Sequence, residues 1–125
     1  MKRQVTTNAI PAPSGSYSQA IVSGGVVYTA GQGPFRPGSD DPVGADVAAQ
    51  TRKTLENLAA VLEAAGSSMA AVLKTTVFLQ DLSEFAAFDA VYAEFFPDPK
   101  PARSTVGCDL GFFKVEIEAV AAVAE

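Results

Sequence analysis

The chain has 125 residues, of which 48% are hydrophobic and 18% charged, a length and composition typical of one globular domain that needs no disulfide or metal to support its core. Asp and Glu number 14 against nine Lys and Arg, so the net charge of -5 disfavours a surface that follows nucleic-acid phosphates. Because the apolar runs also stop well short of the ~20 residues that cross a bilayer, we expect a single domain over residues 1–125 that binds neither nucleic acid nor membrane.

The N-terminal quarter predicts an irregular lead-in followed by a β-hairpin. Its basic start has no apolar segment behind it and does not resemble a signal peptide, so we expect a cytoplasmic protein. Residues 8–16 hold two prolines and small polar residues, and we expect regular structure only from Tyr17 onward. Gly24-Gly25 then separates two apolar runs, which predicts strands at about 18–23 and 26–31 because glycine adopts the positive φ of a tight hairpin turn.

A loop and an amphipathic helix follow. Residues 31–44 contain three prolines and four glycines and predict a surface loop, in which only Gly31 is a candidate for close approach to a ligand. Apolar positions then recur at helical spacing from Asp46 to Ala65. Asp46 can cap the start of this helix and Gly66 can end it.

The next segment predicts a strand and a second helix. Residues 71–81 are rich in β-branched and apolar residues without clean alternation, which favours a strand buried on both faces at the centre of the sheet. Ser83 is expected to cap the helix, and Asp89, off its apolar stripe, is expected to be exposed. The stripe itself, more typical of a core than of a cofactor site, consists of Phe85, Phe88, Tyr92 and Phe95.

The last segment predicts two strands, about 102–108 and 113–123, around a turn at residues 109–111. The element order is then β-β-α-β-α-β-β, an α+β chain in which each helix occupies the place of a crossover between parallel strands. Right-handed crossovers put both helices on one face of the sheet. The other face has no cover within the chain, which predicts association with copies of itself.

The last strand carries charge where apolar residues would suffice. Glu116 and Glu118 share one of its faces, and a turn centred between Asp109 and Leu110 would place Arg103 directly across from Glu116. One interpretation is a partly exposed ion pair at a sheet edge, which contributes only ~0 to 1 kcal/mol. The other is a guanidinium that binds a ligand carboxylate in a subunit crevice while the glutamate holds water against the ligand.

The residue counts narrow the chemistry that such a site can use. The chain has no histidine, which removes the usual general base near neutral pH, the usual zinc ligand and any Ser-His or Cys-His nucleophile pair. Its single cysteine, Cys108, cannot form an intramolecular disulfide. Catalysis would therefore use arginine, lysine, tyrosine, carboxylates or the backbone, with no metal.

Six segments, in order, closely resemble the RidA/YjgF family of reactive-intermediate deaminases. They are GSYSQAI (15–21), AGQGP (30–34), DVAAQTRKTLENLAAVLEAAG (46–66), VLKTTVFLQDLSEFAAFDAVYAEFF (72–96), PARSTV (101–106) and KVEIEAVA (114–121). The resemblance implies a chorismate-mutase-like α+β fold, with a mixed six-stranded sheet and two helices on one face. It also implies a homotrimer with pockets between subunits, and hydrolysis of small-molecule 2-imino acids to 2-keto acids and ammonia without metal or organic cofactor.

The resemblance also implies roles for five residues. Arg103 matches the arginine that clamps the substrate carboxylate, and Glu116 matches the glutamate that places the attacking water. Tyr17 matches a pocket tyrosine, and Gly31 a residue whose backbone borders the imine. Thr105 stands where many members have a pocket cysteine, and its backbone could still bind the imine nitrogen.

Departures from the family pattern leave alternatives open. Asp89 stands where an asparagine often occurs, so the substrate preference is in doubt, as is whether Asp89 enters the pocket. A trimer that holds a small carboxylate and catalyses nothing useful is one alternative. Ribonuclease activity, a label attached to parts of the family, is another, although the net negative charge and the missing histidine count against it.

Overall fold

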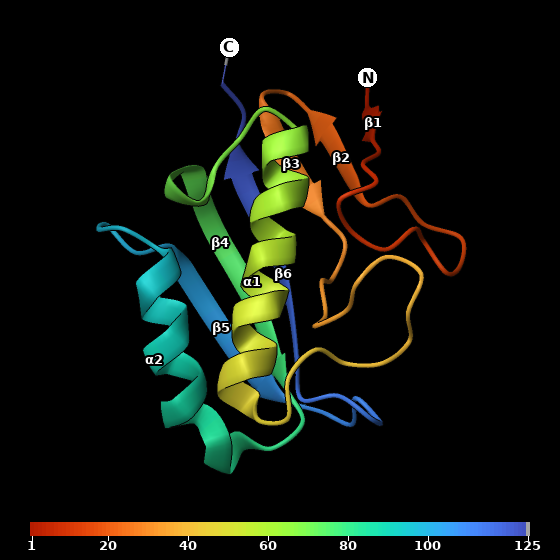
Figure 1. Cartoon of the computed structure of the whole chain (residues 1–125). Helices are drawn as coiled ribbons and strands as arrows, with labels where there is room; N and C mark the ends of the chain where they lie inside the picture. The colour runs from red at the N-terminus through yellow and green to blue at the C-terminus, as the bar shows by residue number, and fades with distance from the viewer. Residues whose placement is uncertain (125) are drawn as a thin grey trace.

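One mixed sheet of six strands carries the fold, in the spatial order β1-β2-β3-β6-β4-β5 (Figure 1). The structure is a computed structural model and describes residues 1–124. Its strands are β1 (Arg3–Val5), β2 (Ala20–Ser23), β3 (Val26–Thr29), β4 (Val72–Leu79), β5 (Ala102–Gly107) and β6 (Val115–Ala122). Its helices are α1 (Val47–Ala64) and α2 (Phe85–Phe95), with single 3-10 turns at Met69–Ala71 and Leu82–Glu84.

Both long helices connect parallel strands, as the sequence predicts. β3 and β4 each pair antiparallel with β6 and so run parallel to one another, with α1 between them in the chain. β4 pairs directly in parallel with β5, and α2 connects these two strands. Figure 1 shows α1 and α2 on the same side of the sheet. The predicted α+β class, with a mixed six-stranded sheet and two helices on one face, is confirmed.

The N-terminal region departs from the expectation of an irregular lead-in. Residues Arg3–Val5 form β1, which pairs antiparallel with β2, so regular structure begins well before Tyr17. The side chain of Val5 is buried, and the Gln19 amide holds the segment by bonding to backbone groups of Thr7 and Pro11. A strand of three residues gives too short a pattern to detect, and its partner defines it.

The hairpin that follows agrees with the prediction. Ser23 pairs with Val26, and Gly24 and Gly25 form the two-residue turn between them. Their φ angles of 60° and 75° are the positive values that a primed turn requires and that glycine adopts without steric cost.

The two helices start differently. The Asp46 carboxylate caps α1 by accepting a hydrogen bond of 2.8 Å from the backbone N–H of Ala49, as predicted. The predicted cap at Ser83 is wrong. The chain first makes the 3-10 turn Leu82–Glu84, whose start is capped by Asp81 accepting from the N–H and the hydroxyl of Ser83. The carboxylate two residues earlier therefore takes the capping position.

The predicted hairpin between the last two strands is also wrong. β5 and β6 are not neighbours, because β4 lies between them. The connection passes the end of β4, where Cys108 N–H donates to the Leu79 carbonyl and Gln80 N–H donates to the Lys114 carbonyl. The chain does reverse direction, but it passes β4 and inserts β6 between β3 and β4, where β6 pairs on both edges instead of with β5.

The sheet has one buried face and one open face. On β4, Val77 and Leu79 are buried against the helices, while Thr76 and Phe78, which alternate with them, are only partly buried. β4 is an interior strand that pairs on both edges, but it lies next to the edge strand β5 and is not buried on both faces, so the prediction of a central, doubly buried strand is wrong. Within residues 1–124 no helix covers the face that carries Phe78, where Tyr28 on β3 is 49% exposed.

Candidate functional site

Arg103 lies on β5 and points to the helical side of the sheet. It pairs in register with Thr75, whose hydroxyl is buried and shares a 2.7 Å hydrogen bond with the Tyr92 hydroxyl of α2. The Arg103 guanidinium lies over the Tyr92 ring, with Cζ 4.6 Å from the ring centroid. The rings of Phe85 and Phe88 lie at 5.2 and 5.7 Å, so aromatic faces of α2 support the cation.

The guanidinium is also ion-paired. Its Nη1 donates to Asp89 Oδ1 at 2.7 Å, and the two side chains are 23% and 44% exposed. The expectation that Asp89 is simply a solvated residue is therefore wrong. Asp89 lies on α2, and the packing of this helix beside β5 brings its carboxylate to Arg103.

A pocket of about 340 Å³ opens around this ion pair. Besides Arg103 and Asp89, its lining includes Tyr92 and Lys100. The Lys100 ammonium donates to the carbonyls of Ala93 and Phe96, so it caps the C-terminal end of α2. We call this the arginine pocket.

Glu116 lies on the opposite side of the sheet. It pairs with Phe78 of β4, and its neighbours Val115 and Ile117 are fully buried beneath the helices. Because side chains alternate along a strand, Glu116 points to the open face while Arg103 points to the helical face. The predicted placement of the two side chains across from each other on one face is wrong, because it assumed the hairpin pairing of β5 with β6.

The carboxylate of Glu116 rests against the backbone of Gly31. A Cβ atom at Gly31 would lie 2.7 Å from Glu116 Cδ, which is closer than real Cβ contacts allow, and 3.0 Å from Cγ, which is tighter than most of them. Two backbone hydrogen bonds between Gln32 and Ile117, of 2.8 and 2.9 Å, hold this loop beside β6. Burial, and secondly the neighbouring charge of Glu118, raise the pKa of Glu116 above its ordinary value.

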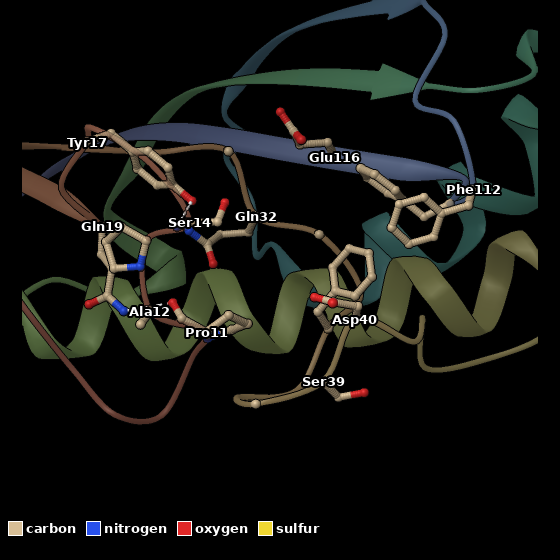
Figure 2. Close-up of a pocket in the computed structure, with 16 residues that line it drawn as sticks. Pro11, Ala12, Ser14, Tyr17, Gln19, Gln32, Ser39, Asp40, Phe112 and Glu116 are labelled. Atoms are coloured by element: carbon tan, nitrogen blue, oxygen red, sulfur yellow. Dashed lines mark hydrogen bonds between the residues drawn. The ribbon is translucent and has the colours of Figure 1, made fainter.

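A second and larger pocket, of about 560 Å³, contains this carboxylate. Figure 2 shows Glu116 between Tyr17 on one side and Phe112 on the other. The Tyr17 side chain is half exposed, and its hydroxyl accepts a hydrogen bond of 3.2 Å from the Ser14 N–H. Gly31 and Gln32 contribute to the lining as well. We call this the glutamate pocket.

An aromatic cluster that the sequence did not single out forms one wall of the glutamate pocket. Phe35, Phe112 and Phe113 meet edge to face, with centroid separations of 5.1 to 5.8 Å. Phe112 is 67% exposed, so its ring adds apolar surface to this wall. The sequence placed Phe113 at the start of a strand and gave Phe112, just before it, no role; the three rings come together because the loop that carries Phe112 and Phe113 lies beside Phe35.

The five predicted site residues thus fall into two groups within one chain. Tyr17, Gly31 and Glu116 line the glutamate pocket. Arg103 lines the arginine pocket, and Thr105, partly buried and two residues further along β5, shares its side of the sheet. Thr105 is in the lining of neither pocket.

Two other observations bear on what the site can do. In residues 1–124, no three His, Cys, Asp or Glu side chains gather as a metal ion would require. Neither α1 nor α2 nor a shorter helix in that range has the length and hydropathy to span a membrane. The groups available for chemistry are a raised-pKa carboxylate, a guanidinium on aromatic rings and backbone groups near Gly31.

Comparison with known proteins places these features in a family. The profile of the family described as Endoribonuclease L-PSP matches residues 6–123. A RutC family protein of Pyrococcus horikoshii is 47% identical over 106 residues, covering 85% of this chain and 84% of the relative. The protein named 2-iminobutanoate/2-iminopropanoate deaminase in Escherichia coli is 41% identical over 129 residues, covering 97% and 98%.

A solved structure agrees with the sequence relatives. The crystal structure of Escherichia coli TdcF with bound serine superposes with a TM-score of 0.89 at 36% identity, covering 98% of this chain and 99% of that one. The agreement extends over the whole sheet and both helices, and the family profile spans all but the ends of the chain. The chain therefore belongs to the Endoribonuclease L-PSP family, which is also the YjgF/RidA family.

Proposed function

We propose that this protein hydrolyses 2-imino acids, such as 2-iminopropanoate and 2-iminobutanoate, to 2-keto acids and ammonia. The observation that carries the proposal is the half-buried carboxylate of Glu116, which faces a pocket and rests on the glycine backbone of residue 31. Its raised pKa makes it a stronger base than an ordinary carboxylate, as delivery of water requires. The deaminase name of the Escherichia coli relative supports the same chemistry.

The proposed reaction needs the arginine pocket and the glutamate pocket together. Within one chain they open on opposite faces of the sheet, so one copy cannot bring Arg103 and Glu116 to one ligand. Two features favour a second copy as the missing part: β5 is an edge strand, and the open face carries partly exposed apolar side chains such as Tyr28. We therefore place the site between copies of a homotrimer, with Arg103 from one copy and Glu116 from its neighbour.

Each residue then has a defined role. The Arg103 guanidinium binds the substrate carboxylate with its remaining N–H donors, since Nη1 already gives one to Asp89. Water adds to the imine carbon as Glu116 accepts its proton, which yields a carbinolamine. The proton moves on to the nitrogen, the C–N bond breaks and ammonia leaves, so that the balance is imine plus water to ketone plus ammonia. Tyr17 and the backbone at Gly31 and Thr105 border the reacting atoms.

The protein contributes orientation more than activation. A protonated imine is already electrophilic, so holding it by its carboxylate beside a fixed base turns a bimolecular step into an intramolecular one.

Three expectations remain predictions: a single domain over residues 1–125, action without a cofactor, and the cytoplasmic location.

One observation favours a second candidate function. Because Asp89 already neutralises part of the Arg103 charge, the pocket can hold a small carboxylate loosely without turning it over. The serine in the TdcF structure is consistent with such a binding module, since serine is not an imine. A ribonuclease is not proposed, because the chain carries a net charge of -5 and no histidine.

The first test is ammonia release from imines generated in place by a serine or threonine dehydratase. Arg103→Ala should abolish the acceleration of ammonia release. Arg103→Lys should do little better, because an ammonium group is a point charge and cannot reproduce the paired N–H donors of a planar guanidinium. Arg52→Ala is the matched control, since Arg52 also pairs with a carboxylate, Glu94, and lies over a ring but belongs to neither pocket. A full rate in Arg103→Ala would overturn the proposed mechanism. Wild-type protein that binds 2-oxobutanoate yet leaves imine lifetimes unchanged would favour the binding module.

The second test asks whether the site lies between copies. Arg103→Ala and Glu116→Gln chains are mixed, unfolded and refolded together. A pocket that takes Arg103 from one copy and Glu116 from the next is intact in about a quarter of cases in a random 1:1 mixture, so activity should return to about that fraction. No recovery in mixed assemblies, or sedimentation as a monomer, would contradict the shared pocket.

A further inference from the structure

The arginine pocket contains a negative charge in direct contact with its cation. Asp89 Oδ1 accepts from Arg103 Nη1 at 2.7 Å, and both side chains remain partly open to solvent. Stacking on the Tyr92 ring, whose centroid lies 4.6 Å from Arg103 Cζ, favours this position of the guanidinium. A ligand carboxylate that binds Arg103 must therefore approach Asp89 as well.

Within residues 1–124, the other cation that lines this pocket, Lys100, makes no ion pair with Asp89. The Lys100 ammonium is turned to the carbonyls that end α2, and its nearest carboxylate is that of Asp98 at 3.9 Å, a side chain that is 89% exposed. The cation and the anion that face a ligand are therefore Arg103 and Asp89. Together they present a positive group and a negative group side by side.

Such a pair distinguishes ligands by their second charge. A keto acid presents only a carboxylate, which Arg103 attracts and Asp89 repels. An imino acid protonated on nitrogen has a cation one bond from the carbon that bears its carboxylate, and Asp89 attracts that cation. At separations of a few ångström in a partly exposed pocket these interactions are large enough to change affinities several-fold.

We propose that Asp89 makes the arginine pocket selective for zwitterionic ligands, which carry a positive nitrogen next to the carboxylate, over ligands that carry the carboxylate alone. The proposal rests on the proposed function in one respect, that Arg103 is the carboxylate anchor. It assigns Asp89 a selectivity role, in which its carboxylate attracts the positive nitrogen of a ligand whose carboxylate is bound by Arg103. Its consequence is that the protonated imino acid is held more firmly than the keto acid that leaves.

The test compares two ligands of the same carbon skeleton by titration calorimetry on the whole protein. L-2-aminobutanoate carries an ammonium group beside its carboxylate, and 2-oxobutanoate does not. Wild-type protein should prefer the amino acid, and in Asp89→Asn the ratio of the two dissociation constants should shift toward the keto acid by about fivefold or more. Asp98→Asn removes the same charge at Lys100 without touching Arg103, and its ratio should stay at the wild-type value.

The ratio of the two dissociation constants separates a change in selectivity from general damage to the fold, because loss of structure weakens the binding of both ligands alike. Asp89→Ser, which also removes the charge, replaces Asp89→Asn if that variant does not fold. An unchanged ratio in the Asp89 variant, or an equal shift in Asp98→Asn, overturns the proposal while leaving the deaminase mechanism standing. Two results would overturn both the proposal and the role of Arg103 as the carboxylate anchor. One is an Arg103→Ala variant that binds both ligands as tightly as wild type does, and the other is a wild-type protein that binds neither ligand.

Discussion

Replacing Gly31 by alanine should separate folding from catalysis. The Gly31 backbone is held beside β6 by the bonds between Gln32 and Ile117, so the new methyl group cannot withdraw. It would lie 2.7 Å from Cδ of Glu116, whereas ordinary contact begins at 3.4 Å. The carboxylate must therefore retreat by at least about 0.7 Å.

The size of the two effects follows from that displacement. Glu116 is a flexible side chain at the wall of an open pocket, and turning it away from its preferred rotamer costs about 0.5–1.5 kcal/mol, so the fold should survive. A misplacement of about 1 Å in a group that delivers water can cost about 10²-fold in rate. We expect Gly31→Ala to lose one to two orders of magnitude in kcat/KM while its melting temperature changes little.

The assay is the dehydratase-coupled release of ammonia, with thermal unfolding measured in parallel. Gly15→Ala is the matched control, because its new methyl group would meet only the Tyr17 ring at an ordinary 3.9 Å. Both measurements should stay near wild type in the control. A Gly31→Ala protein with an undiminished rate would refute the argument that this glycine exists to seat Glu116, and a protein that fails to fold would show that the contact is structural.

Two further predictions concern the buried hydroxyl pair and the charge next to Glu116. Tyr92→Phe leaves the buried Thr75 hydroxyl without its partner and should lower the free energy of unfolding in urea by about 1–3 kcal/mol. The double variant with Thr75→Val should regain most of that loss, and equal stabilities of the single and double variants would contradict this explanation. Glu118→Gln removes the charge that helps to raise the pKa of Glu116, so the acid limb of the pH profile of kcat/KM for imine hydrolysis should move to lower pH. An acid limb that stays in place or moves to higher pH would show that Glu116 is not the titrating base.

Features that depend on neighbouring residues in the chain could be predicted from sequence. Gly24-Gly25 specifies a tight hairpin because the required backbone angles are available to few other residues. Asp46 and the spacing of apolar residues behind it specify α1, because a cap and a 3.6-residue period are properties of a single helix. The placement of both helices on one face follows from the handedness of crossovers, which is also general.

The sequence predicted which residues belong to the candidate site, but it did not predict how they are arranged in space. Resemblance to a family identified Tyr17, Gly31 and Glu116, which the structure gathers at one pocket. It also identified Arg103, but the assumed pairing of the last two strands placed that side chain on the wrong face. The partner of Arg103 within the chain, Asp89, was assigned to solvent because its contact is between two elements.

The residues by themselves determined the kind of most elements, the Asp46 cap of α1, the Gly24-Gly25 turn and the absence of histidine that limits the chemistry. Only the tertiary structure decided that β6 inserts beside β4, and with it that Arg103 and Glu116 face opposite ways. The reason is that a strand's pattern records which residues share a face, whereas the neighbour it pairs with, and hence what each face meets, is set by the free energy of the whole sheet.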